Sequence, residues 1–148
     1  MAQENPGTSF TVEAIENQVK TLIEMLGDEN AARRNWAVGR LSGIGNSVIP
    51  TLTRDFSARP YGVRREIVTI LGRIATPEAK GKLIEMILDP DYGVRNRVSI
   101  VLIDWADKDP QLIDQIKMVQ YRNPHVQSSL QILVETIVYK KVEQELSL

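Results

Sequence analysis

The 148-residue chain contains no cysteine and only one histidine, His125. The lack of cysteine excludes disulfides, thiolate nucleophiles and attachment of a cofactor through sulfur. A single histidine cannot supply the histidine and cysteine cluster of a zinc site. Asp104, Asp107, Asp109 and Asp114 lie close together in the sequence, but their spacing fits no calcium-binding loop. We interpret them as helix caps and solvated charges, and we expect neither a metal nor a cofactor.

Long apolar runs and a strong net charge are also missing. No apolar stretch approaches the roughly 20 residues that cross a bilayer, and the first residues lack the basic start and apolar core of an export signal. We therefore expect a cytoplasmic protein with no membrane partner. The formal net charge of −1 disfavours nucleic acid as a partner. The chain also lacks a phosphate-binding glycine loop and a nucleophile–base pair, which favours a role other than enzyme catalysis.

What the chain does contain is an internal repeat. Tyr61–Arg64, read as Tyr-Gly-Val-Arg, returns 31 positions later as Tyr92–Arg95. Leu22–Met25 returns 61 positions later as Leu83–Met86, close to twice that step. A period in this range is typical of stacked helical repeats. Aligning the copies divides the chain into four repeat units, at roughly 12–45, 46–76, 77–107 and 108–146.

Each repeat unit reads as two helices separated by a short polar break. Val68, Leu71 and Ile74 follow helical spacing, and Thr76-Pro77 places a capping side chain before a proline that suits a first helical position. Such pairs bury their apolar faces only by lying against their neighbours. The sequence thus predicts an all-α fold, an α-solenoid of about four helical hairpins (about eight helices) with right-handed superhelical stacking. We expect a flexible tail over 1–10 and one domain over 11–148.

A family resemblance rests on the breaks between the helices. Asp89-Pro90-Asp91-Tyr92-Gly93-Val94-Arg95 resembles the HEAT-like repeats of the phycobilisome-lyase group, and 28–34 and 59–64 are looser copies. The resemblance implies a scaffold or adaptor that binds another protein through a HEAT-like surface. It also implies an alternative, a lyase-like or chaperone subunit in bilin attachment to phycobiliproteins or in phycobilisome turnover. Because the chain has no thiol to hold a bilin, it could only position the pigment and its acceptor.

Arginines occupy one register position near the start of three predicted helices. Arg34, Arg64 and Arg95 align, although the helix macrodipole disfavours a cation there by a few tenths of a kcal/mol. We expect acidic groups of the loops to offset this cost in a structural ladder, and the resemblance supports such a role. Contact with a ligand is the alternative, because bidentate arginine geometry suits both. The acidic members of the ladder are Asp28, Asp89 and Asp91.

The next register positions predict a binding surface. Trp36 shares a position with Glu66 and Arg97, so we expect it to face solvent, whereas Trp105 aligns with core positions. Either the N-terminal segment, through Phe10 or Val12, covers Trp36, or Trp36 anchors a partner. Tyr61 and Tyr92 either pack on their own helices or present an aromatic edge. The predicted partner-binding residues are Trp36, Tyr61, Arg65, Tyr92 and Arg97.

The last predicted helix departs from the repeat. It continues through Val134, Ile137, Val138, Val142 and Leu146, more apolar residues than one buried face needs. The sequence leaves two interpretations, a terminal cap or a face for self-association.

Overall fold

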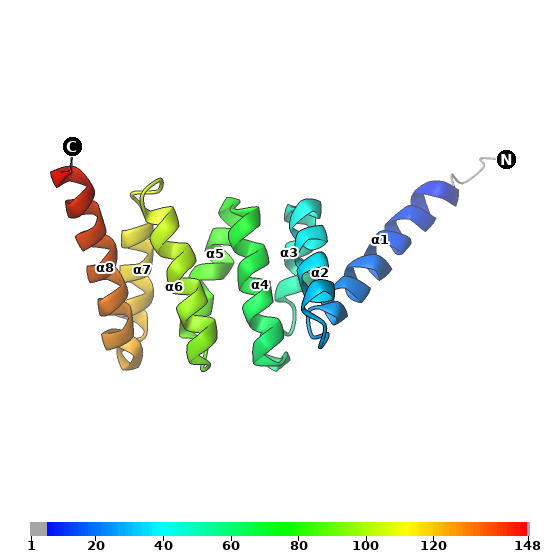
Figure 1. Ribbon diagram of the computed structural model, residues 1–148, viewed down its shortest axis with the longest axis horizontal. Helices are drawn as coiled ribbons and strands as arrows, with labels where there is room; N and C mark the ends of the chain where they lie inside the picture. Colours follow the sequence, from blue (N-terminus) through cyan, green and yellow to red (C-terminus); the bar gives the residue numbers. More distant parts are fainter. Residues whose placement is uncertain (1–5, 148) are drawn as a thin grey trace. The chain divides into compact units, whose positions relative to one another are not determined.

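The fold is all-α, as the sequence predicts. A computed structural model describes residues 6–147, with the backbone alone described at 6–11, 126, 127 and 129. Within these residues the chain forms eight α-helices and four short 3₁₀ turns, and no strand (Figure 1). Residues 1–5 of the predicted tail over 1–10 lie outside the described residues, and residues 6–10 belong to helix α1, which begins at Pro6.

The contacts divide the chain into two compact units, Met1–Ile74 and Ala75–Leu148. Each unit holds four of the α-helices. The single domain predicted over 11–148 stays a prediction, because each unit is described by itself. The boundary falls between the second and third predicted repeat units, so each compact unit corresponds to two predicted hairpins.

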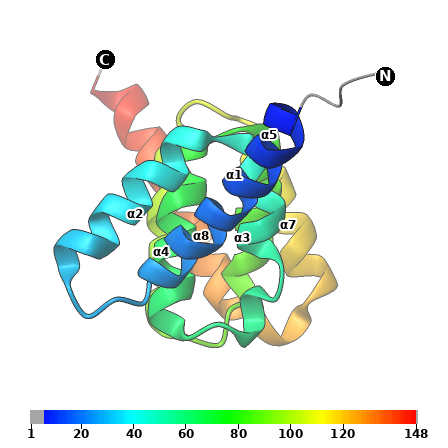
Figure 2. The same ribbon diagram turned by 90° about the vertical axis from the view of Figure 1, so that its right-hand side faces the viewer.

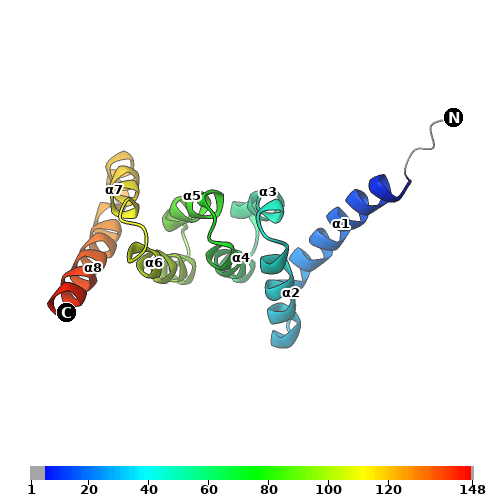
Figure 3. The same ribbon diagram turned by 90° about the horizontal axis from the view of Figure 1, so that it is seen from above.

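The first unit comprises α1 (Pro6–Met25), α2 (Ala31–Ile44), α3 (Ile49–Thr53) and α4 (Tyr61–Ile74). The 3₁₀ turns Asn46–Val48 and Phe56–Ala58 precede α3 and α4. Helix α1 contacts α2 and α3, and α4 contacts α2 and α3. Figure 2 shows α1 and α2 on either side of the loop that joins them, and in Figure 3 α3 lies to one side of α2 and α4. The helices that come first in each hairpin therefore contact each other, as do those that come second.

The second unit repeats this arrangement. It comprises α5 (Pro77–Glu85), α6 (Tyr92–Ala106), α7 (Leu112–Arg122) and α8 (Gln127–Leu146), with 3₁₀ turns at Met86–Leu88 and Pro124–Val126. Helix α5 contacts α7, and α6 contacts α8, while α5 contacts α6 and α7 contacts α8. Figure 3 shows α5 and α7 on one side of this unit and α6 and α8 on the other.

The core of each unit consists of aliphatic side chains at helical spacing. Leu41 and Leu71 in the first unit, and Leu102 in the second, share one repeat position and are all fully buried. The position three residues further on is different. Ile44 is exposed, and Trp105 is only half-buried, with the ammonium of Lys80 5.5 Å from the centre of its ring. The prediction that Trp105 belongs to the core is therefore wrong in degree, because this position lies in the last turn of its helix, α6 (Tyr92–Ala106), and is only half-buried.

The predicted caps are confirmed in part. Thr76 accepts a hydrogen bond from the backbone N–H of Ala79, so Pro77 does occupy a first helical position. Asp109-Pro110 has the same cap-and-proline sequence as Thr76-Pro77, but Asp109 accepts from the backbone N–H of Gln111, and α7 begins only at Leu112. Pro110 therefore belongs to a turn before the helix, because the Asp109 carboxylate closes that turn locally.

Candidate protein-binding surface

Two of the breaks between helices have the same geometry, one in each unit. In the first unit the Asp28 carboxylate accepts from the Asn30 backbone N–H at 2.8 Å, and Asn30 caps α2 by accepting from Ala32 and Arg33. In the second unit the Asp89 carboxylate accepts from the Asp91 backbone N–H at 2.9 Å. Asp91 then caps α6 by accepting from the Val94 N–H. The pairs Asp28/Asn30 and Asp89/Asp91 are thus one local structure, used twice, 61 residues apart.

The repeated arginines hold these breaks closed. Arg34 Nη1 donates to the carbonyl oxygens of Asp28 and Glu29, at 2.6 and 2.9 Å. Arg95 Nη1 donates to the carbonyl oxygens of Asp89 and Pro90, both at 2.8 Å. These acceptors supply the negative partial charge that a cation near a helix N-terminus requires.

The third arginine of the set behaves similarly. Arg64 Nη1 donates to the carbonyl oxygen of Arg59, which occupies the position of Glu29 and Pro90 in the repeat. Backbone carbonyls within one hairpin are therefore acceptors for all three arginines. The wider ladder, with acidic side chains bridging neighbouring hairpins, stays a prediction.

Exposed aromatic side chains lie on arginines along the second helices of the hairpins. On α2, the Arg40 guanidinium carbon lies 6.0 Å from the centre of the Trp36 ring. On α4, Arg65 lies 4.7 Å from the Tyr61 ring, and on α6, Arg95 lies 5.9 Å from the Tyr92 ring. A guanidinium over an aromatic face is attracted by the ring quadrupole, by about 0.5–1 kcal/mol at exposed sites.

Trp36 faces solvent, as its register predicts. Its side chain is 56% exposed, and Val12, one of the two proposed covers, is itself exposed. Phe10, the other proposed cover, lies outside the residues whose side chains are described. Tyr61 and Tyr92 are also exposed, whereas Arg65 and Arg97 are half-buried.

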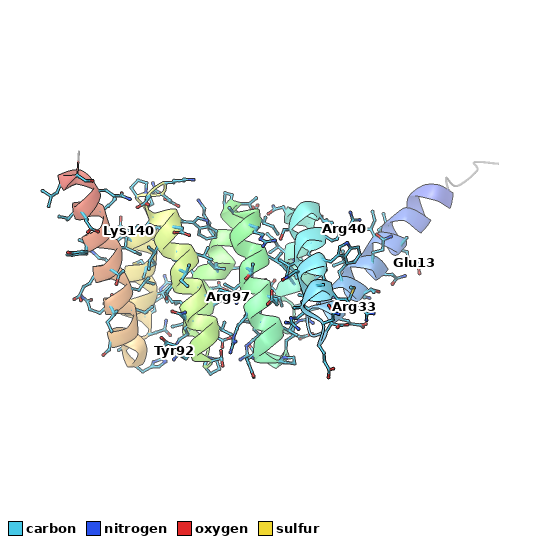
Figure 4. All side chains as sticks on the ribbon, viewed as in Figure 1. Glu13, Arg33, Arg40, Tyr92, Arg97 and Lys140 are labelled. Carbon is cyan, nitrogen blue, oxygen red and sulfur yellow. The ribbon has the colours of Figure 1, made fainter. Side chains whose placement is uncertain are left out.

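The five predicted partner-binding residues fall in both units. Trp36, Tyr61 and Arg65 belong to the first unit, on the mutually contacting helices α2 and α4. Tyr92 and Arg97 belong to α6 of the second unit, where Figure 4 labels both side chains. A single surface that joins all five stays a prediction.

A groove in the first unit lies beside Trp36, between α1 and α2. Its volume is about 480 Å³. Its lining combines an apolar floor with uncharged polar groups and one cation, as follows: Asn17, Gln18, Thr21, Leu22, Met25, Trp36 and Arg40. Arg40 is not among the residues that the sequence predicts for binding, although an arginine four residues after an exposed tryptophan on a helix is a signal for such a pair. Figure 4 labels Arg40 on α2.

A second groove lies between α7 and α8 in the second unit. Its volume is about 600 Å³, and Lys117, Val138, Tyr139 and Val142 are among its lining residues. Helix α8 buries Leu130, Leu133, Val134 and Ile137. Its other face exposes five apolar residues: Ile132, Val138, Tyr139, Val142 and Leu146. Of the five residues that the sequence singles out on the last helix, Val138, Val142 and Leu146 are exposed, whereas Val134 and Ile137 are buried. Self-association stays a prediction.

The aspartates near the end of α6 form ion pairs with lysines of α5 and α8. The Lys140 ammonium on α8 lies 3.9 Å from an Asp104 oxygen and 3.8 Å from an Asp107 oxygen, and Lys80 lies 3.7 Å from Asp109. In the part of the chain that the structure describes, no three histidine, aspartate or glutamate side chains gather closely enough to hold a metal ion. Within that same part, no helix is both long and apolar enough to cross a bilayer.

Compared with known proteins, the chain matches no family model, no curated protein and no solved structure.

Proposed function

We propose that this chain is a protein-binding scaffold, in which HEAT-like helical hairpins stack as a right-handed α-solenoid and the second helices carry the binding surface. Two features support the stacking. Within each unit the first helices of the hairpins contact each other and the second helices contact each other. The breaks at 28–34 and 89–95 also share one hydrogen-bond arrangement, as expected of repeats that present equivalent positions to the same side.

The observation that carries the binding proposal is the exposed Trp36, stacked on Arg40 at the edge of a groove. Tryptophan, tyrosine and arginine are the residues most enriched among those that dominate interface energetics. A tryptophan held by a neighbouring arginine also loses little conformational entropy when it binds. Tyr61 on Arg65 supplies a second such pair on the contacting helix α4.

Affinity capture from cells that naturally produce the chain tests this proposal. We expect Trp36→Ala combined with Tyr61→Ala to lower recovery of the captured protein at least about tenfold. Both side chains are largely exposed, so helical circular dichroism and the melting temperature should change little. Tyr121→Ala is the matched control, because Tyr121 is an aromatic residue that is 84% exposed on α7, a first helix of its hairpin.

The outcomes separate clearly. Normal capture by the Trp36 and Tyr61 double variant would show that the binding surface is assigned to the wrong helices. Equal loss by the Tyr121 variant would show that exposed aromatic residues matter wherever they stand, which contradicts a surface confined to the second helices.

A further inference from the structure

Helix α2 carries charge of one sign only. The helix carries Arg33, Arg34 and Arg40 and no acidic residue. Two of these cations already have acceptors: Arg34 donates to the loop carbonyls, and Arg33 pairs with the Asp28 carboxylate at 3.6 Å. Among the described residues, Arg40 has no acidic partner, and its guanidinium lies over the Trp36 ring.

Arg40 is also the one charged residue among those that line the groove between α1 and α2. On the α1 side, the groove presents the exposed amides of Asn17 and Gln18. The charged residues of α1, which are Glu13, Glu16, Lys20 and Glu24, are not part of the lining. The groove therefore has a formal charge of +1, with neutral hydrogen-bonding groups opposite the cation.

The floor of the groove is apolar. Leu22 is buried, Met25 is half-buried, and the exposed Trp36 indole stands at the edge. Methionine adapts its shape to irregular partners, and an indole gains free energy when another apolar group covers it. A volume of about 480 Å³ falls within the roughly 300–1,000 Å³ of ordinary ligand sites. It has room for a few side chains of an extended segment.

We infer that this groove binds a short acidic segment of a partner protein. A large apolar side chain of that segment covers Met25 and Trp36, and an adjacent carboxylate pairs with Arg40, while Asn17 and Gln18 offer hydrogen bonds to the segment's backbone. The inference rests on the proposed scaffold function and names the chemistry of the partner at one of its sites. A nucleic acid is a poorer match, because its binding needs several cations along the groove.

Selection from a random twelve-residue peptide library displayed on phage, with the full chain as bait, tests this inference. We expect the recovered peptides to carry aspartate or glutamate next to an aromatic or large aliphatic residue. Their affinity, measured on synthetic copies by fluorescence anisotropy, should fall at least about tenfold for Arg40→Glu and for Trp36→Ala. Arg54→Glu is the control for general charge, because Arg54 is exposed and lies outside the groove; it should change affinity much less.

A charge exchange makes the test specific to the Arg40 contact. Copies of the recovered peptides with lysine in place of the acidic residue should bind Arg40→Glu more tightly than they bind the parent chain. Recovery of basic or uncharged peptides would overturn the inference. So would acidic peptides whose affinity is unchanged by Arg40→Glu.

Failure of the inference can be told apart from failure of the scaffold proposal. If the recovered peptides are indifferent to Arg40→Glu but weakened by Tyr61→Ala, the groove is wrong and the second-helix surface remains. If no peptide is recovered and the double variant Trp36→Ala, Tyr61→Ala captures its partner normally, both fail.

Discussion

The arginines that close the breaks between helices provide the sharpest test of the repeat. Arg34 and Arg95 each donate two hydrogen bonds from one nitrogen to carbonyl oxygens of their own break. Replacing either arginine with methionine keeps most of the apolar stem and removes these bonds. Because the two breaks have the same geometry, we expect the two variants to lose similar amounts of stability.

The size of the expected loss of stability follows from how exposed the two carbonyl acceptors are. A hydrogen bond with a charged group contributes about 1.5–3 kcal/mol where it is well buried. In each break one acceptor is part-buried and the other exposed, so we expect about 2 kcal/mol for the two bonds together. For a chain of this size, that corresponds to a fall of about 4–8 °C in the melting temperature.

Urea denaturation followed by circular dichroism measures the loss. Arg54→Met is the control, because Arg54 is exposed and lies in the loop after α3; we expect its effect to stay within about 0.5 kcal/mol. If Arg34→Met and Arg95→Met are no more destabilised than this control, the hydrogen bonds do not hold the breaks. A large loss in one variant alone would refute the equivalence of the two breaks.

Two further predictions concern α2 and α8. Gly45, at the end of α2, has a φ of 86° and a ψ of −144°, a conformation that only glycine adopts readily, so Gly45→Ala should destabilise the chain by about 1–3 kcal/mol. Gly39 lies within α2 with nothing within 4 Å of an added Cβ, so Gly39→Ala should stabilise the chain by up to about 1 kcal/mol. Thermal melts in which both substitutions shift the melting temperature in the same direction would contradict this. If the exposed face of α8 mediates self-association, sedimentation equilibrium should show a dimer that Tyr139→Glu converts to monomer. A parent chain that is monomeric at high concentration would rule this out.

The repeat predicts some structural details well and others poorly. The buried leucines at 41, 71 and 102 and the exposed Trp36 follow directly from helical register, because period decides which side of a helix faces its neighbours. Register alone does not say how far along a helix those neighbours extend. Trp105 shares a register with aliphatic residues but is only half-buried near the end of α6, so register alone overestimates its burial.

The candidate site shows the same division. The sequence indicated Trp36, Tyr61 and Arg65 as surface residues but did not indicate the stacking of Trp36 on Arg40 or the groove beside it. The stacking is local, and the i, i+4 spacing would have been enough to suggest it. The groove cannot be read from one helix, because residues of both α1 and α2 line it.

The sequence alone determined that this chain is helical, that its helices come in pairs and that three arginines occupy equivalent positions. Each of these properties depends on contacts within a few turns of one helix, which periodicity and capping residues encode directly. Only the tertiary structure decided what those arginines bind, how far Trp36 and Trp105 are covered and which residues line the groove. Such properties depend on which segments, far apart in the sequence, pack against each other. One period in the sequence is compatible with many different packing arrangements.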